Sequence, residues 1–351
     1  MQPKWPSLIR SSSRRRLLAL ALPTLILMAG LSALELRRGP SRTLIAVAAG
    51  ERIYEDELPP IVTQQVMQLR YEEYKTRADA LNNLLSERLL DSEARREGLS
   101  TAALLRKHVP PAPPSSTELY AFYRAHPQDF KGTFETEKPR IGATLVASRV
   151  ADARRIYLQT LHAGERASVL LLPPRTSVSP DWTRIRGNSG APVMIVEFAD
   201  FQCLFCREAE PVLRSLLAEY KDQISLSFRD FPLRAVHPQA ELAAEAARCA
   251  GEQRKFWQYH DLLFADDRKL DPAGLSRDAA LIGIELAQFE TCLSSGRYAQ
   301  GIRNDIADGE RAGVGGTPTF IIDGYFLPGV QSKHEFERII DLLLSGERTA
   351  P

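Results

Sequence analysis

Apolar positions follow two different spacings along the chain, and the spacing changes close to Val193. Before this residue they recur mostly at steps of three and four, as in the series that starts at Leu81 and continues through Leu84 and Leu85 to Leu89. Such steps place side chains on one face of an amphipathic helix. After Val193, short runs of valine, isoleucine and phenylalanine alternate with helical segments. This pattern is typical of buried strands in an α/β domain.

The first half predicts a mainly helical region. Amphipathic spacing predicts helices over 55–74, 78–98, 117–125 and 151–162. We also expect a small strand over 44–48, a turn over 50–54 and a strand-like run within 137–150. Prolines interrupt the pattern over 108–116 and again over 171–182. The second proline-rich stretch predicts a linker between two domains.

The second half predicts a sheet covered by helices. The predicted strands cover 193–198, 224–231, 317–323 and 325–330. The last two form a hairpin whose turn is the dipeptide Asp323-Gly324. Helices are expected over 206–223, where Pro211 would introduce a kink, and over 333–344. Residues 238–307 have a helical pattern and would form an insertion in the α/β domain.

Composition narrows the class of protein. A length of 351 residues suits two domains, and 44% hydrophobic with 25% charged residues is ordinary for a globular protein. The formal net charge of +1 gives no electrostatic argument for a nucleic-acid partner.

The N-terminus carries a membrane-targeting signal. Arginines at positions 14, 15 and 16 precede the uncharged, mostly apolar run 17–34. At 1.5 Å per residue, 18 residues span about 27 Å, enough to cross the hydrocarbon core of a bilayer. We therefore favour an uncleaved single-pass anchor, with residues 1–38 as cytoplasmic segment and transmembrane helix, over a cleaved signal peptide. The basic cluster places the N-terminus in the cytoplasm and the rest of the chain on the other side of the inner membrane.

The strongest chemical signal is Cys203-Leu-Phe-Cys206, which follows the apolar run 193–198 and opens a helix. Two thiols at this spacing can form a small disulfide, and unpaired N–H groups at a helix N-terminus stabilise a thiolate there. A second motif, Gly316-Thr317-Pro318-Thr319, enters a strand and is a candidate for a cis peptide bond. Zinc sites use the same cysteine spacing, but no second such pair follows.

These motifs carry a resemblance. The segments Glu197-Phe-Ala-Asp200-Phe-Gln-Cys203, Phe256-Trp257-Gln-Tyr-His260 and Gly316-Thr317-Pro318, in this order, resemble the DsbA-like branch of the thioredoxin superfamily. The resemblance covers 187–346. It implies a thioredoxin fold interrupted by a helical insertion at about 238–307, with Pro318 in cis and facing the cysteines. Many members have proline where this chain has Leu204, and the residues between the thiols tune the redox potential.

The site residues follow from position and from this resemblance. Cys203 is expected to be the exposed nucleophile with a lowered pKa, and Cys206 the buried resolving thiol. The resemblance implies that Glu197 is a buried carboxylate beneath the cysteines that relays a proton; the alternative is a solvent-exposed glutamate at the edge of its strand. Thr317 and Pro318 are expected to face the thiols and to offer backbone groups to an extended substrate.

Other polar and aromatic residues near the motif receive structural interpretations. Asp200 is more consistent with capping a loop or helix, and His260 with packing in an aromatic patch. Phe201 and Phe205 form either an apolar rim for substrate or part of the core.

Cys249 and Cys292 remain, each in a helical pattern. A structural disulfide between them is our first interpretation, two buried free thiols the second and a zinc site the third.

The first half carries a less specific resemblance. The segments Ala46-Val-Ala-Ala-Gly50-Glu-Arg and Leu84-Leu-Ser-Glu-Arg-Leu89 are similar to the N-terminal helical domain of SurA- or PrsA-type chaperones. Residues 141–164 are similar to the opening strand and helix of a parvulin prolyl isomerase. The chain then enters the linker too early to complete that domain, so we predict no prolyl isomerase activity. The region either binds peptides or acts as a helical spacer.

Together these expectations describe an α/β protein with a thioredoxin fold over 187–346, a linker over 171–186 and a mainly helical domain over 42–170. The expected function is extracytoplasmic thiol–disulfide exchange on folding, cysteine-containing proteins. It needs no cofactor but does need a membrane redox partner that recycles the cysteines. The alternatives are a disulfide isomerase or reductase of the same fold, or a non-catalytic chaperone.

Overall fold

The computed structural model describes residues 43–164, 169–265 and 269–346, and it divides into two units, 1–59 and 60–351. In the first unit, β1 (Leu44–Ala48) and β2 (Glu51–Tyr54) form an antiparallel hairpin, followed by the short 3-10 helix η1 (Glu55–Glu57). Ala49 and Gly50, the two turn residues, both have positive φ, as a two-residue hairpin turn requires. The turn expected over 50–54 is therefore shorter, because Glu51–Tyr54 pairs with β1 as a strand.

The helical region at the start of the second unit is more continuous than the sequence pattern predicts. Helix α2 (Pro60–Arg96) has 37 residues and replaces two predicted helices. No glycine or proline lies between residues 60 and 96 except Pro60 itself, so nothing in the backbone ends the helix near Lys75. Short helices α3 (Thr101–His108) and α4 (Ser116–Ala125) follow, and a capping box at Ser115 and Glu118 begins α4.

The strand-like run within 137–150 is a wrong prediction. Residues 134–164 form one helix, α5 (Phe134–Gly164), which contains Pro139 in its second turn. The apolar residues of this segment also fit helical spacing, and Ile141 is completely buried. Because no turn residues bound the run, its period cannot separate strand from helix. Residues 141–164 therefore do not begin with a strand, so the predicted similarity to the opening strand of a parvulin prolyl isomerase is lost.

A second, smaller helical core holds this region together. Leu90 and Ala94 of α2 and Leu104 of α3 are buried, and Tyr157 and Leu158 of α5 pack against them. The end of α2, α3 and α5 therefore stabilise one another by burial of apolar surface.

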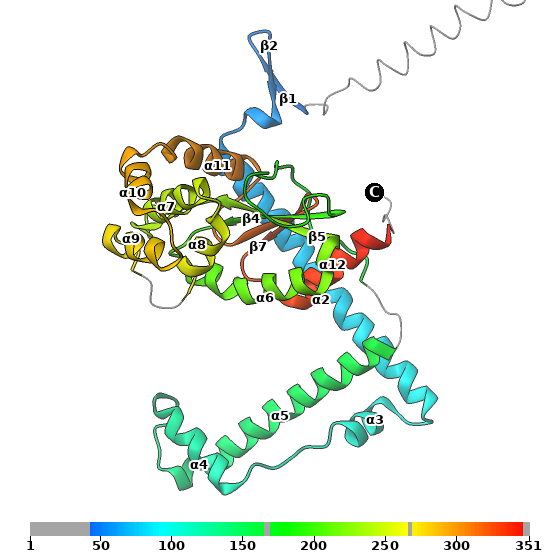
Figure 1. Ribbon diagram of the computed structural model, residues 1–351. Helices are drawn as coiled ribbons and strands as arrows, with labels where there is room; N and C mark the ends of the chain where they lie inside the picture. Colours follow the sequence, from blue (N-terminus) through cyan, green and yellow to red (C-terminus); the bar gives the residue numbers. More distant parts are fainter. Residues whose placement is uncertain (1–42, 165–168, 266–268, 347–351) are drawn as a thin grey trace, which may run out of the picture. The chain divides into compact units, whose positions relative to one another are not determined.

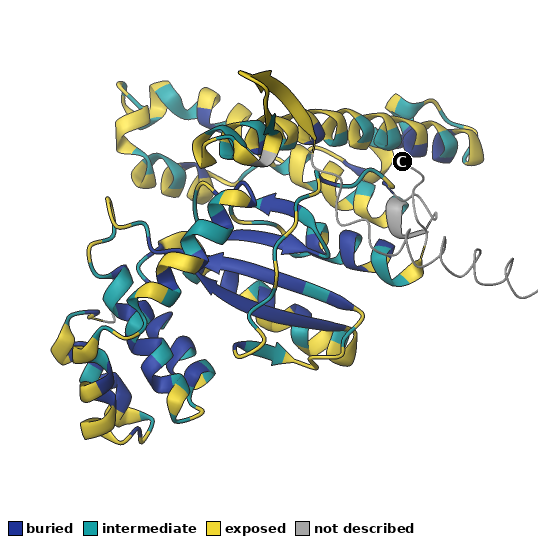
Figure 2. Cartoon of the chain, turned by 90° about the horizontal axis from the view of Figure 1, so that it is seen from above, coloured by how far each residue is buried: buried dark blue, intermediate teal, exposed yellow. Residues whose placement is uncertain are grey.

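The central sheet has five strands in the order β3-β5-β4-β6-β7. The strands are β3 (Ile185–Gly187), β4 (Val193–Ala199), β5 (Ile224–Asp230), β6 (Thr319–Ile322) and β7 (Tyr325–Pro328). Strands β4 and β5 pair in parallel, and the other neighbours pair antiparallel. Every residue of β5 is buried, and Figure 2 shows the central strands buried along most of their length. The expected α/β sheet, with its Asp323-Gly324 hairpin, is present.

Helices cover both faces of the sheet (Figure 1). On one face, apolar residues of α6 (Leu204–Tyr220) and α12 (Lys333–Ser345) pack on β4, β5 and β6. On the other face, Met67 of α2 joins Val196, Phe198, Phe231 and Ile321 in one buried cluster. The beginning of α2, which the sequence groups with the N-terminal domain, is thus also a packing element of the sheet.

Polar contacts fix α2 to the end of the chain. The Tyr74 hydroxyl donates a 2.6 Å hydrogen bond to Glu335, and Arg338 donates a 2.7 Å hydrogen bond to the same hydroxyl. The ring of Tyr71 meets that of Phe326 edge-on at 6.4 Å. These contacts join residues more than 250 positions apart.

The helical insertion contains α7 (Ala240–Glu252), α8 (Phe256–Leu263), α9 (Pro272–Leu281), α10 (Leu286–Ser295) and α11 (Ala299–Arg311). A disulfide joins Cys249 of α7 to Cys292 of α10, in agreement with the first of the three interpretations. Asp305 of α11 accepts hydrogen bonds of 2.6, 2.7 and 2.6 Å from Arg184, Arg229 and Arg248. This buried ionic network ties the insertion to β5 and to the segment before β3.

The apolar run 17–34 lies outside the described residues. Within the part of the chain that the structure describes, no helix has both the length and the hydropathy needed to cross a membrane.

Candidate active site

The two cysteines of the C-x-x-C motif lie where β4 ends and α6 begins. Cys203 is the N-cap of α6, and Cys206 lies within its first turn. Asp200 holds the preceding loop: its carboxylate accepts hydrogen bonds from the amides of Gln202 (2.7 Å) and Leu233 (2.8 Å), and its backbone oxygen accepts one from the amide of Cys203 (3.0 Å). Asp200 therefore caps a loop, as the sequence suggests.

The Thr317-Pro318 segment lies opposite the cysteines. The peptide bond between these residues is cis, and the segment leads into β6, which pairs with β4. The sulfur of Cys203 lies 3.4 Å from the carbonyl oxygen of Thr317, to which the thiol form donates a hydrogen bond. The sheet thus brings together two motifs that are 114 residues apart.

The surroundings of Cys203 stabilise its thiolate. The largest cause is the Cys206 thiol, which donates a hydrogen bond to the Cys203 sulfur; the Thr317 side chain and the backbone N–H groups of Cys206 and Phe205 act in the same direction. Desolvation opposes them, and the net result lowers the pKa of Cys203 to about 5. The buried Thr317 hydroxyl makes no hydrogen bond to a described residue in this geometry. At neutral pH Cys203 is therefore a thiolate.

Cys206 has the opposite environment. It is completely buried, and burial raises the pKa of its thiol well above the ordinary value, with the nearby Cys203 and Glu197 adding to the effect. The pair therefore consists of one anionic and one neutral sulfur. Cys203 is less accessible than expected for an outer thiol, because only 5% of its surface is exposed.

The two aromatic residues next to the motif have different environments. Phe201 is buried and stacks on Phe228 at 5.2 Å, so it belongs to the core. Phe205 is 58% exposed and Leu204 is 50% exposed. These two residues between the cysteines form an apolar rim at the site.

Glu197 lies on β4 and is completely buried. Neither of its carboxyl oxygens has a hydrogen-bond partner within the described residues. Burial raises the pKa of Glu197 well above its ordinary value, and the charge of Glu210 adds to this shift while Arg186 opposes it. The alternative of a solvent-exposed glutamate is therefore wrong, and a buried carboxyl group with a raised pKa lies close enough to Cys206 to influence it.

Sequence reasoning missed Glu210 and its position beside His260. Glu210 on α6 is buried, and its Oε1 atom lies 3.6 Å from Nε2 of His260 on α8. The other ring nitrogen of His260 lies 3.0 Å from Asp261. Glu210 follows Cys206 by four residues, so a helix places both on one face. This spacing could have indicated from the sequence that Glu210 lies on the same side of the helix as Cys206. His260 packs among Phe228, Trp257 and Phe264, as the aromatic pattern suggested.

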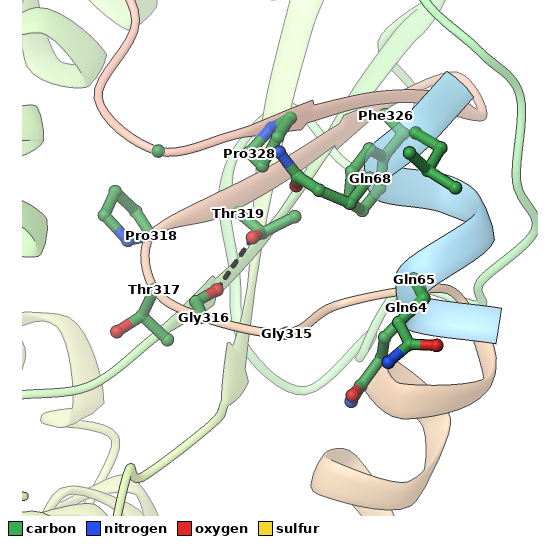
Figure 3. Close-up of a pocket in the computed structure, with 13 residues that line it drawn as sticks. Gln64, Gln65, Gln68, Gly315, Gly316, Thr317, Pro318, Thr319, Phe326 and Pro328 are labelled. Carbon is green, nitrogen blue, oxygen red and sulfur yellow. Dashed lines mark hydrogen bonds between the residues drawn. The ribbon is translucent and has the colours of Figure 1, made fainter. Parts of the chain in front are cut away.

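A pocket of about 680 Å³ adjoins the Thr317-Pro318 segment. Figure 3 shows Gln64, Gln65 and Gln68 of α2 on one side of it and the loop from Gly315 to Thr319 on the other. Phe326 and Pro328 of β7 also line this pocket. No sequence signal linked α2 to this site.

Comparisons with known proteins bear on the second half of the chain. A family model described as thioredoxin matches residues 180–342, so this segment is a thioredoxin-like domain. Among curated relatives, a protein named Na(+)/H(+) antiporter NhaA 3 from Salinispora tropica is 42% identical over 179 residues, which cover 51% of this chain and 26% of the relative. A protein named Na(+)/H(+) antiporter NhaA 1 from Salinispora arenicola is 36% identical over 206 residues, which cover 59% of this chain and 31% of the relative. The chain thus spans less than a third of these relatives.

Several solved structures are similar to the same part. A thioredoxin-like oxidoreductase from Silicibacter pomeroyi has 24% identity and a TM-score of 0.43, covering 49% of this chain and 95% of its own. The thiol-disulfide exchange protein alpha-DsbA2 from Wolbachia pipientis has 23% identity and a TM-score of 0.43, and the match covers 46% of this chain and 88% of that protein. BdbD from Bacillus subtilis has 20% identity and a TM-score of 0.44, and the match covers 49% of this chain and 99% of that protein. The predicted likeness of the first half to SurA- or PrsA-type chaperones stays a prediction.

Proposed function

We propose that this protein is a thiol–disulfide oxidoreductase that forms disulfides in polypeptide substrates through Cys203 and Cys206. The observation that carries the proposal is the asymmetry of the two thiols. Cys203 has a pKa of about 5 at the tip of α6, whereas burial keeps Cys206 protonated three residues further on. A pair used only to hold a structure has no need of two sulfurs with opposite protonation states.

The reaction begins with the Cys203–Cys206 disulfide. A substrate thiolate attacks the sulfur of Cys203, a new S–S bond forms, and the bond to Cys206 breaks. Cys206 leaves with the electron pair and takes up a proton, because its pKa is high. A second substrate thiolate then attacks the substrate sulfur of the mixed disulfide. Cys203 leaves as a thiolate, and two electrons have passed from the substrate dithiol to the enzyme.

Glu197 is the group that we propose as proton donor to Cys206 in the first step. Burial raises its pKa and so favours the protonated form, and its two oxygens have no partners among the described side chains and backbone groups. A buried acid with a raised pKa is suited to deliver a proton to an equally buried sulfur. The same group accepts the proton in the reverse direction.

The direction of the reaction follows from the stability of the thiolate. A low pKa of Cys203 stabilises the reduced form, and stabilising the reduced form makes the oxidised form a stronger oxidant. We therefore favour substrate oxidation over the reductase and isomerase alternatives. A further protein, which we propose to be a membrane redox partner, would take the two electrons from the reduced enzyme.

We also propose that the enzyme works outside the cytoplasm. The Cys249–Cys292 disulfide supports this location, because structural disulfides persist in oxidising compartments. The apolar run 17–34 remains the proposed membrane anchor, with signal cleavage and secretion as the alternative. Because the chain spans only 26% and 31% of the two antiporter relatives, we do not extend their ion transport to it.

The reduction potential of the Cys203–Cys206 pair tests the proposal. The purified protein would be equilibrated with mixtures of reduced and oxidised glutathione, and the two thiols trapped and counted. A potential near roughly −120 mV supports an oxidase, and one near roughly −270 mV supports a reductase. Oxidation of a reduced, unfolded model protein would be followed in parallel. Full biological activity retained by a Cys203→Ala variant would refute the enzyme and favour a chaperone that only binds its clients.

A further inference from the structure

The pocket beside the cysteines has walls from two distant parts of the chain. One wall is the loop Gly313 to Thr319 together with Phe326, Pro328 and Gly329 of the hairpin that follows. The other wall is the start of α2, with Gln64, Gln65, Gln68 and Leu69 (Figure 3). The thioredoxin-like domain therefore does not build this pocket alone, because the lining residues 64–69 of α2 lie more than 100 positions before its first residue.

The pocket and the reactive sulfur share a neighbour, the Thr317-Pro318 segment. Thr317 and Pro318 belong to its lining, and the carbonyl oxygen of Thr317 is 3.4 Å from the sulfur of Cys203. A polypeptide joined to Cys203 through its own cysteine would have its neighbouring residues at the mouth of this pocket. The position of the thiol therefore argues for a substrate chain as the occupant.

The chemistry of the lining points to an uncharged, extended segment. None of the residues that line the pocket carries a charge. Glutamine side chains offer both donors and acceptors, so they can pair with the peptide groups of any sequence. A Cβ atom placed on Gly316 would meet nothing within 4 Å, which leaves the backbone of the loop uncovered. Phe326, Pro328 and the 69% exposed Leu69 provide apolar surface for side chains.

The two walls are held in fixed positions relative to each other. Met67, between the glutamines of α2, is buried against Phe198 and Val314. The Gln64 side chain donates a 2.8 Å hydrogen bond to the carbonyl oxygen of Val314. Gly313 has φ +92°, and a Cβ there would lie 2.6 Å from Met67, so α2 and the loop are in close contact. A preformed pocket loses little entropy when it binds a chain.

From these observations we propose that the start of α2 and the loop 313–319 together bind an extended, uncharged segment of the substrate next to its reacting cysteine. The inference rests on the proposed function and adds the part of the chain that recognises the polypeptide: contacts with α2 would favour polypeptide thiols over small thiols such as glutathione. The helix N-terminal to the thioredoxin-like domain would then determine specificity.

A double variant tests the proposal, Gln65→Ala with Leu69→Ala, since both side chains are exposed and line the pocket. The measured quantity is a ratio: kcat/KM for an uncharged peptide with two cysteines, divided by the rate constant for reduction by dithiothreitol. We expect this ratio to fall about five- to tenfold, because apolar and amide contacts to the peptide are lost. The matched control, Asn83→Ala with Leu84→Ala, changes exposed residues of the same helix that do not line the pocket. Its ratio should equal that of the unchanged protein.

A trapped complex gives a second, independent readout. In a Cys206→Ala variant, the Cys203 thiolate would attack a peptide whose cysteine is activated as a disulfide with thionitrobenzoate and which carries a photo-crosslinking residue two positions after that cysteine. The mixed disulfide forms as the S–S bond to thionitrobenzoate breaks, and thionitrobenzoate leaves with the electron pair. We expect crosslinks to residues 64–69 of α2. Crosslinks elsewhere, or an unchanged ratio in the pocket variant, would overturn the pocket assignment while leaving the enzyme intact. Failure of Cys203 to form any mixed disulfide would instead refute the proposed function.

Discussion

Replacing Cys206 by alanine should weaken the thiolate character of Cys203. The Cys206 thiol is the largest of the groups that lower the pKa of Cys203 to about 5, because it donates a hydrogen bond to the charged sulfur. Alanine removes this donor, while the Thr317 side chain and the backbone N–H group of Phe205 remain. The pKa of Cys203 should therefore rise, without reaching the value of an ordinary thiol.

The size of the rise follows from the strength of one hydrogen bond to a charged group. Such a bond contributes about 1.5–3 kcal/mol. One pKa unit corresponds to about 1.36 kcal/mol, so the pKa of Cys203 should rise by about one to two units, to about 6–7. At pH 5 the thiolate fraction would then fall from about one half to between about 1% and 10%. The remaining thiolate becomes more nucleophilic as its pKa rises, so the midpoint of the pH profile is a better measure than a single rate.

The assay is the rate of alkylation of Cys203 by iodoacetamide between pH 3 and 10. The reduced protein should give a midpoint near pH 5 and the Cys206→Ala variant a midpoint near pH 6–7. Cys206→Ser keeps a hydroxyl donor and should lie between them. Loss of labelling in Cys203→Ala confirms that this thiol is the one observed. A midpoint of the unchanged protein near pH 8.5, or an identical midpoint in Cys206→Ala, would refute the reasoning about the site.

Three further outcomes are expected. Glu197→Gln keeps the shape of the buried side chain but cannot give up a proton. Substrate oxidation measured by stopped flow should therefore slow about ten- to hundredfold, while the alkylation midpoint of Cys203 moves little. An unchanged rate would exclude Glu197 as the proton donor. The lowered pKa of Cys203 stabilises the folded, reduced protein fully above the unfolded-state pKa of about 8.5, and this stability is lost as the pH falls through about 5. Thermal unfolding should therefore show the reduced form losing stability relative to the oxidised form from pH 8 to pH 4, and a constant difference would contradict the lowered pKa. Asp305→Ala removes the one carboxylate that accepts hydrogen bonds from Arg184, Arg229 and Arg248, of which the first two are buried. Urea unfolding should therefore show a loss of about 3–5 kcal/mol, and a loss below about 1 kcal/mol would show that the network contributes little.

The sequence was sufficient for the local parts of the site. The pair Cys203 and Cys206 lies between a strand and a helix, and both elements have unambiguous apolar patterns. The Asp323-Gly324 turn and the helix after it were predictable for the same reason, since each depends on nearby residues. The order of these motifs also carried the resemblance that implied a carboxylate at Glu197.

The failures concern contacts between distant segments. Nothing in the spacing of α2 shows that Met67 packs on the sheet, because a helix with one apolar face can cover any partner. The low exposure of Cys203 likewise depends on packing across the site, which its position at the start of a helix does not show. The run within 137–150 was assigned to the wrong element because its apolar residues fit two periods, and the pattern alone does not separate a strand from the helix that forms there.

The participation of α2 in the sheet has a practical consequence for anyone who wishes to isolate the redox half. Residues 180–342, the span of the thioredoxin match, begin well after α2 and would leave Val196, Phe198 and Phe326 without the cover of Met67 and Tyr71. Such an excised fragment would expose a hydrophobic face of the sheet to water and should precipitate or self-associate. A soluble minimal enzyme would have to retain Pro60 to about Lys75 or receive that helix back as a separate peptide.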